Sequence, residues 1–390
     1  MKNMRGLRAG KKKIFLTICL VVIFLHIFST SVFGEITDNI TMPEGFGEVR
    51  DALPDDALDM LPEGILSQNA EEQGKALSEM TSPQYAFEFV KDLIGVEIGT
   101  AAKLFATVAG ILIISSALNA MRASLSSHSL GTAMRFCMTG AVASALIGVQ
   151  FSQLAGVSKY FERISSLMGA MIPVGSSVLA MGGNLSTAAT SSATLSVFLG
   201  VCETLCAKTI VPVVCVSTAL ALCNTLNSEL GLRGFASAIR KTYTFILGAV
   251  MTLLVASLSS QTALSSAADS AGARAARLIS TTAIPIVGGS VGDTLRTVAS
   301  GVSYLKTVVG VGGIVFVLML VFPVLVSLIL TRVVFLLTSG VADMLGCETE
   351  GKLLSELGSV WGTMIAVVAM CAVMFILALV IFVRITVAAA

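Results

Sequence analysis

The sequence predicts an all-α, polytopic membrane protein with about seven or eight transmembrane helices and re-entrant or amphipathic segments between them. Hydrophobic residues make up 55% of its 390 residues and charged residues only 13%, against ~25% charged in soluble domains. Charge-poor runs long enough to cross a bilayer recur along the chain. Glycine and proline interrupt some of these runs, which favours short segments that enter the membrane without crossing it.

Residues 1–34 are predicted to be a signal peptide. Six basic residues precede the 15-residue apolar run "IFLTICLVVIFLHIF", which is short for a span and suited to a secretory signal. Small residues just before Glu35 offer a cleavage site. The alternative is an uncleaved first transmembrane helix. In both cases the segment that follows is sent across the membrane.

Residues 35–92 are predicted to form an acidic extracytoplasmic segment. Of the 24 acidic residues, 15 lie between Glu35 and Thr100, where there are only three basic residues. Prolines at the starts of short helical stretches favour helices joined by turns. The segment is too short to bury much core, so we expect a docking arm for a basic partner surface or a solvated cap. Its last part, "YAFEFVKDLIGVEI", predicts an interfacial helix.

Residues 93–390 are predicted to be the multipass transmembrane domain. Its apolar runs are 104–121, 136–155, 167–185, 193–226, 243–260, 309–330 and 362–383. The fourth run is too long for one span and short for two, and Lys208 and Pro212 in its middle favour a helical hairpin. Basic residues after the first and fourth runs predict that both loops are cytoplasmic. The stretch "GVSKYFERISSL" predicts an amphipathic helix on the membrane surface.

The segment 279–292 is apolar but too short to cross a bilayer. We predict a re-entrant or half-helix element, whose broken backbone must be covered by protein or by a water-filled cavity. Asp293 is expected to cap an amphipathic helix that lies along the surface before residue 309. The candidate pore or packing residues of this segment are Pro285, Gly288, Gly292, Asp293 and Arg296.

An internal echo places a second broken segment earlier in the chain. "RISSLMGAMIPVGSS" (163–177) resembles "RLISTTAIPIVGGS" (277–290), with Ile-Pro in both. Matched Gly/Pro-broken segments in internal repeats mark the functional centre of many transport folds. The alternative is chance recurrence of a frequent apolar combination. Under the repeat interpretation, Pro173 and Gly175 are also candidate pore or packing residues.

The residues offer little for enzymatic chemistry, and we expect no enzyme and no cofactor. "GCETEGKL" (346–353) nearly matches a phosphate-binding loop, but its acids repel phosphate and the hydroxyl that binds Mg²⁺ is missing. Cys202 and Cys206 share a helix face without a nearby histidine, so the eight cysteines are interpreted as small buried hydrophobes rather than metal ligands. With only two histidines, Ser-His or metal-water mechanisms lack material.

Glu203 and Lys208 lie inside the longest apolar run. Ionisable groups at membrane depth are functional candidates by default, but five residues apart they do not share a face of an α-helix well. The alternative is that both sit near the turn of a hairpin and reach the interface.

The signal peptide, the acidic arm and the polytopic body together resemble the stage III sporulation protein AE family of endospore-forming bacteria. The most specific stretches are "IPIVGGSVGDTL" and "SYLKTVVGVGGIVFVLMLVFPVL", followed by the last apolar helix. The resemblance implies a multipass protein of the mother-cell membrane around the forespore, with its N-terminal segment extracytoplasmic.

The resemblance also implies a set of partners. They are a secretion-type ATPase and ring-forming proteins of the same operon, and a partner made in the forespore. Together they would form a trans-envelope channel needed for late forespore development. Glycines such as Gly310, Gly312 and Gly313 permit close approach of helices within the chain or between copies of it. No nucleic-acid partner is expected. The alternatives are a stand-alone secondary transporter, with Glu203 as a titrating residue, or a non-conducting scaffold.

Overall fold

The computed structural model describes residues 75–76, 79, 83–122, 128–226, 232–283 and 288–385 of the chain. The predicted signal peptide and nearly all of the acidic segment lie outside these residues. The described part is all-helical, as the composition predicts. Its helices are α5 (Pro83–Arg122), α6 (His128–Met181), α7 (Leu185–Cys202), the π-helix η1 (Glu203–Ala207), α8 (Lys208–Leu226), α9 (Leu232–Ala283), α10 (Gly288–Met344) and α11 (Glu348–Arg384).

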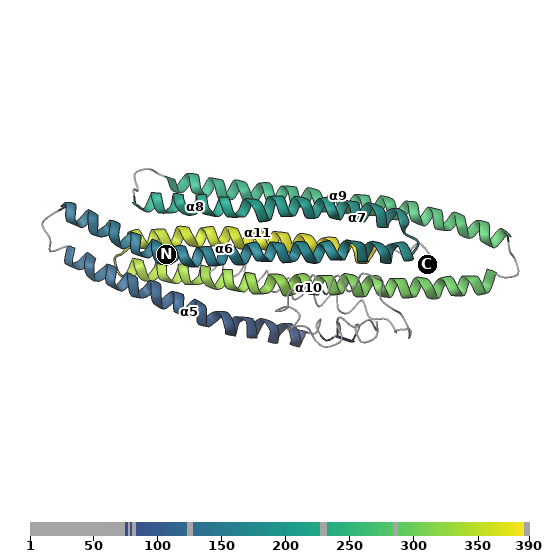
Figure 1. Cartoon of the computed structure of the whole chain (residues 1–390), viewed down its shortest axis with the longest axis horizontal. Helices are drawn as coiled ribbons and strands as arrows, with labels where there is room; N and C mark the ends of the chain where they lie inside the picture. The colour runs from purple at the N-terminus through teal and green to yellow at the C-terminus, as the bar shows by residue number, and fades with distance from the viewer. Residues whose placement is uncertain are drawn as a thin grey trace, which may run out of the picture.

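The helices run along one long axis and form an elongated bundle (Figure 1). α10 and α11 make the most extensive pairing, with α5 and α6 packed on α10 and α8 and α9 packed on α11. The chain reverses direction at each end, so the links α5–α6, α8–α9 and α10–α11 share one end and the links α6–α7 and α9–α10 share the other. At this second end α9 and α10 project beyond the other helices (Figure 1).

Six helices in the described part are long and apolar enough to cross a membrane, counting α7, η1 and α8 as one. The predicted helical hairpin in residues 193–226 is therefore wrong, because the chain continues as helix from Leu185 to Leu226. Neither Lys208 nor Pro212 reverses the chain. Pro212 lies inside this continuous helix, where it removes one backbone hydrogen bond without ending the helix.

Two amphipathic stretches also belong to longer helices rather than lying separately on a surface. "GVSKYFERISSL" is the middle of α6, where Val157, Tyr160 and Ile164 are buried in the core while Lys159 and Glu162 point outward. "YAFEFVKDLIGVEI" is the first part of α5, so the expected boundary at residue 92 falls inside a helix. In α6 the apolar stripe packs on neighbouring helices. In α5 Tyr85 and Phe89 pack against the core, whereas Ile94, Val96 and Ile98 are exposed.

The interior of the bundle is filled by side chains. Trp361 stacks edge-on against Phe335 with ring centroids 4.8 Å apart, and Phe198 meets Phe375 at 6.0 Å. The largest fully buried side chains come from α5, α6, α7, α8, α10 and α11, and include Trp361, Tyr160, Phe198, Phe335 and Phe375. These side chains form one contiguous core along the bundle.

Polar contacts hold the helix ends in register. Asp269 of α9 accepts backbone N–H bonds from Ser186 (3.1 Å) and Thr187 (2.8 Å) in the first turn of α7. A carboxylate at this position satisfies unpaired donors and complements the positive end of the helix dipole. The chain reaches α7 through Gly183, whose φ of 78° favours glycine. Lys306 of α10 donates to the carbonyl of Ile385 after α11.

The two loops that were expected to be cytoplasmic, after residues 121 and 226, both lie at the same end of the bundle. Arg233 and Lys352 lie near this end, whereas Leu185 lies at the opposite one. This shared placement agrees with the prediction that both loops lie on the same side of the membrane.

We therefore expect single cysteines at Lys352 and Leu185, two exposed positions, to face opposite sides of the membrane. In a background without the native cysteines, an impermeant thiol reagent added to intact cells should label only Leu185→Cys, and lysis should expose Lys352→Cys. Labelling of both from the same side would contradict the topology.

Candidate functional site at the π-helical turn

The centre of the long α7–η1–α8 helix is a π-helical turn, Glu203–Ala207. The backbone N–H of Lys208 donates to the carbonyl of Glu203, five residues earlier. A π-turn holds one residue more than an α-turn, and such turns are frequent at functional sites. This site has three faces, formed by an ion pair, by a tyrosine from α9 and by a group of thiols.

The outer face carries the ion pair between Lys208 and Glu203, with Nζ 3.4 Å from Oε1. The expectation that residues five apart share a face poorly holds for an α-helix but is wrong here, because the π-turn brings positions 203 and 208 into line. The side chains are 66% and 49% exposed, so the pair lies on the outside of the bundle.

On a second face, Tyr243 of α9 holds the turn. Its hydroxyl donates to the carbonyl of Leu205 at 3.1 Å and lies 3.0 Å from the Thr209 hydroxyl. Thr209 also donates to the Leu205 carbonyl. These bonds supply partners for backbone that the wider turn leaves outside the regular α-helical pattern.

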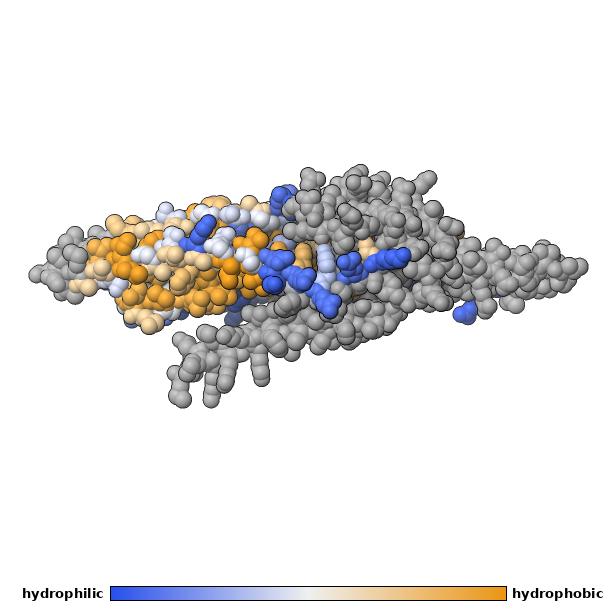
Figure 2. Space-filling model, turned by 90° about the horizontal axis from the view of Figure 1, so that it is seen from below, coloured by the Kyte–Doolittle hydropathy of each residue, from blue (hydrophilic) through white to orange (hydrophobic). Residues whose placement is uncertain are grey.

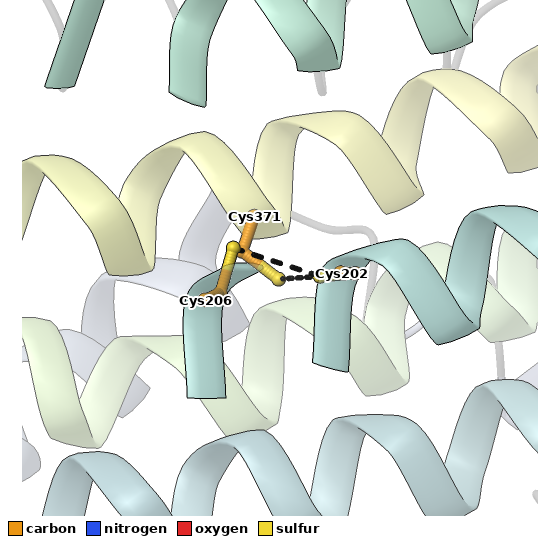
Figure 3. A group of neighbouring side chains, drawn as sticks. All are labelled: Cys202, Cys206 and Cys371. Carbon is orange, nitrogen blue, oxygen red and sulfur yellow. Dashed lines mark hydrogen bonds between the residues drawn. The ribbon is translucent and has the colours of Figure 1, made fainter. Parts of the chain in front are cut away.

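The inner face brings three thiols together (Figure 3). Cys202 and Cys206 come from α7 and η1, and Cys371 comes from α11. The Sγ atoms of Cys202 and Cys371 are 2.9 Å apart, those of Cys202 and Cys206 are 3.9 Å apart, and all three lie within 4.8 Å of one another. All three residues are buried.

The sequence showed only part of this group. The spacing of Cys202 and Cys206 places both on one helix face, but Cys371 lies 169 residues from Cys202 and sits among apolar residues without a distinctive pattern. The interpretation of every cysteine as a buried hydrophobe is also too simple, since Cys137, Cys215 and Cys223 are exposed.

Tyr160 of α6 lies beside the three thiols. Its side chain is only 2% exposed, and its hydroxyl lacks a well-aligned hydrogen-bond partner. A buried hydroxyl without a partner is costly. The hydroxyl interacts with the Cys371 thiol without forming a well-aligned hydrogen bond, so this buried donor faces a weak acceptor.

The segment around Pro173 and Gly175 is not broken as the sequence predicts. α6 continues through Pro173 to Met181, and the hydroxyls of Ser176 and Ser177 each donate to the Pro173 carbonyl at 2.9 Å. These bonds go to the carbonyl of Pro173 itself, and not to that of Gly169, which loses its N–H partner at the proline. The second Ile-Pro site of the echo, residues 284–285, lies outside the described residues.

Gly175 lines a cavity of about 30 Å³ between α6, α7, α10 and α11. Phe382 packs against this glycine, so that a Cβ there would lie 3.3 Å from the ring. The hydroxyl of Ser191, which also lines the cavity, has no hydrogen-bond partner. A cavity of this volume holds about two water molecules and is too small to be a conduit for solutes.

The predicted re-entrant segment, 279–292, lies at the projecting end of the α9–α10 pair (Figure 1). α9 continues to Ala283 and α10 begins at Gly288, and only the backbone of this region is described. Pro285 lies outside the described residues. Gly288, Gly292, Asp293 and Arg296 occupy the first turns of α10.

Two expectations about this segment are therefore wrong. Asp293 does not cap the helix, because α10 begins five residues earlier. The expected surface helix does not end before residue 309, because α10 is continuous to Met344. Local periodicity could not reveal this continuity.

Two buried carboxylates at the other end of the bundle were missed. Glu356 accepts from Arg233 and, at 3.2 Å, from Arg240. Glu350 is 1% exposed and faces the hydroxyls of Thr139 (3.4 Å) and Ser115 (3.5 Å). Glu350 belongs to "GCETEGKL", where acids in the first turn of α11 complement the helix dipole instead of binding phosphate.

Comparison with known protein families matches residues 70–386 to the model of Stage III sporulation protein AE. The match includes every described helix. No curated protein and no solved structure matches the chain.

Proposed function

Because the chain belongs to the stage III sporulation protein AE family and is thus a membrane protein of sporulation, we propose that it is a structural subunit of a trans-envelope complex between mother cell and forespore. It acts without catalysis, as a platform or wall element in the mother-cell membrane. Its partners are the ATPase and ring-forming proteins of the same operon and a protein made in the forespore.

The observation that carries this proposal is the exposure of apolar side chains over more length than one bilayer covers. Phe136 and Met181 lie on the same helix, α6, and are 62% and 53% exposed. At 1.5 Å per residue they are about 68 Å apart, whereas the hydrocarbon core is ~30 Å thick. Leu253 and Leu264 on α9 are also exposed. Part of this apolar surface must be covered by protein.

Charges halfway along the bundle strengthen the argument. Lys159 and Glu162 on α6 and the pair Glu203–Lys208 at the π-turn lie outside the core. They are at nearly the same level, since Tyr160 of α6 lies beside the three thiols. Figure 2 shows apolar surface over one end and hydrophilic residues near the middle. Charges near the bilayer centre are costly, so the bilayer covers one side of this level and partners cover the other.

The packed interior of the bundle favours a passage that does not run through a single chain. The core of a single chain is packed with aromatic and branched side chains, so a passage through the complex would run between chains. We propose that the projecting α9–α10 end, where α10 begins at Gly288, is a contact for the forespore-facing partners rather than a pore lining.

Photocrosslinking in sporulating cells tests the proposal. A photoreactive residue is placed singly at Phe136, Met181, Leu253 and Leu264, and adducts are identified by mass spectrometry. Positions on one side of the mid-bundle charges should yield adducts with proteins of the complex, and these should disappear when the operon partners are deleted. Only lipid adducts at all four positions would contradict the proposal.

One observation favours a transporter as the second candidate. Glu350 is a buried carboxylate surrounded by hydroxyls, which suits an ion or proton site better than the exposed Glu203 does. A transporter should lose function in Glu350→Gln, whereas a structural subunit should retain most of it. Glu203→Gln is the exposed control, and sporulation efficiency together with the amount of membrane-inserted protein is the measurement.

A further inference from the structure

We propose that Cys202, Cys206 and Cys371 form a binding site for one thiophilic d¹⁰ metal ion, copper(I) or zinc(II), with the Tyr160 hydroxyl as a hydrogen-bond donor to a metal-bound sulfur. The proposal does not depend on the role in the sporulation complex. It rests on the arrangement of the ligands, on the unpartnered tyrosine and on the π-turn.

The sulfur positions suit a single ion. Zinc binds cysteine sulfur at about 2.3 Å, which in tetrahedral geometry separates the sulfurs by about 3.8 Å. Cys202 and Cys206 are 3.9 Å apart, and the whole group lies within 4.8 Å. The 2.9 Å between Cys202 and Cys371 must widen by ~1 Å to reach that spacing, which a small rotation of one side chain provides.

Tyr160 is the second, independent observation. Its hydroxyl is buried, lies beside the three thiols and has no well-aligned partner. Thiols are weak acceptors, but a metal-bound thiolate is a charged acceptor that such a donor would satisfy. Donors of this kind orient ligands and tune the affinity of metal sites. A sulfur ionised by a metal would give this hydroxyl a stronger acceptor than the neutral Cys371 thiol that it faces.

The chemistry of the ligands limits the choice of ion. Thiolates select soft ions such as copper(I) and zinc(II) and disfavour Mg²⁺ and Ca²⁺. Three ligands suit copper(I), while zinc usually takes a fourth. Three thiolates leave a net charge of −1 around zinc and −2 around copper(I), and the smaller charge is favoured in an apolar interior. The coordination number thus favours copper(I) and the net charge favours zinc(II). The experiment below distinguishes the two ions.

The site would fasten the middle of the α7–α8 helix to α11. Cys202 and Cys206 flank most of the π-turn, and Cys371 lies near the centre of α11. A metal bridge at this point would hold the wider turn against the neighbouring helix. The expected effect is a bundle whose thermal stability depends on bound metal.

The test uses the full-length protein purified in detergent under reducing conditions. We expect elemental analysis to find about one copper or zinc ion per chain after exhaustive dialysis. Competition with a copper(I)-specific chelator and with a zinc-specific one identifies the ion. Added cobalt(II) should produce thiolate charge-transfer absorption, which reports sulfur ligation independently of any biological activity.

Variants separate the site from adventitious binding. Cys206→Ser and Cys371→Ser should each lose the ion, whereas Cys215→Ser and Cys223→Ser, which remove exposed thiols, should retain it. Tyr160→Phe should keep the ion but bind it about 10- to 100-fold more weakly. Size-exclusion profiles identify any variant that fails to fold, and Cys206→Ala then replaces it.

Two outcomes would overturn the proposal. One is a folded protein with less than a tenth of an ion per chain, and no cobalt(II) absorption. The other is a Cys202–Cys371 disulfide found by mass spectrometry in protein isolated from reducing cells. An equal metal content in the wild type and in Cys371→Ser would likewise assign the ion to other groups.

Discussion

Replacing Glu356 with leucine is expected to destabilise the bundle by about 3–5 kcal/mol, the range for removing one partner of a buried ion pair. Glu356 binds two arginines, Arg233 and Arg240. The side chains of Glu356 and Arg240 are only 9% and 8% exposed. Without the carboxylate, Arg240 is left as an unpaired charge in the interior. Its Nη1 already lacks a partner, so no other acceptor is at hand.

The measurement is the loss of monodisperse protein on heating in detergent. A matched control is available in the same helix, where Lys352 and Glu348 form an exposed pair at 3.5 Å. Lys352→Ala should change stability by less than about 1 kcal/mol, because exposed pairs contribute little. The double variant Arg240→Leu/Glu356→Leu should recover much of the loss, since it leaves no buried charge. A double variant as unstable as Glu356→Leu would show that leucine packing, not the charge, causes the loss.

The class of the protein was accessible from the sequence because it depends on composition. Long charge-poor runs require helices in a membrane, and the described part of the structure is helical throughout. The resemblance to the sporulation family is confirmed by the match over residues 70–386. Both inferences use many residues at once, so single errors matter little.

The helix boundaries were less accessible, because the sequence was divided on the assumption that each apolar run crosses one bilayer. The stretch around Lys159 was therefore interpreted as a separate surface helix, and Lys208 as part of a hairpin turn. In the structure these charges lie on the outer faces of helices that continue past them. The helices contain 37 to 57 residues when α7, η1 and α8 are joined, which is about 55–85 Å. Only packing against neighbours explains that length.

The candidate site shows the same limit. The ion pair of Glu203 and Lys208 depends on a π-turn, and the thiol group depends on a contact between helices far apart in the chain. A π-turn has no reliable sequence signature, and Cys371 is surrounded by residues that fit any buried helix. The local pattern of Cys202 and Cys206 was visible, but the third ligand is a property of the fold.

Three glycines of α10 are the basis of the second prediction with a large expected effect. Gly310, Gly312 and Gly313 were expected to permit close approach of helices. A Cβ at Gly313 would lie 2.7 Å from Sδ of Met171 on α6 and 3.2 Å from Cδ1 of Leu379 on α11. α10 is thus packed so closely that a side chain at 313 would displace the ends of Met171 and Leu379. The expectation about close approach is confirmed at this position.

Gly313→Leu should therefore prevent the native packing of α10 between α6 and α11. Overpacking a filled core costs typically 1–3 kcal/mol and more where backbones must separate, and here two helices must move. Gly340→Leu is the matched control on the same helix, since nothing lies within 4 Å of a Cβ there, and it should be stable. The readouts are the yield of monodisperse protein and sporulation efficiency, both of which should fall strongly for Gly313→Leu alone. Combining it with Met171→Ala removes the closest obstructing side chain and should restore part of the yield. If Gly313→Leu were as stable as Gly340→Leu, α10 could not lie this close to α6 and α11. The volume of the cavity beside Gly175 would then be larger than about 30 Å³.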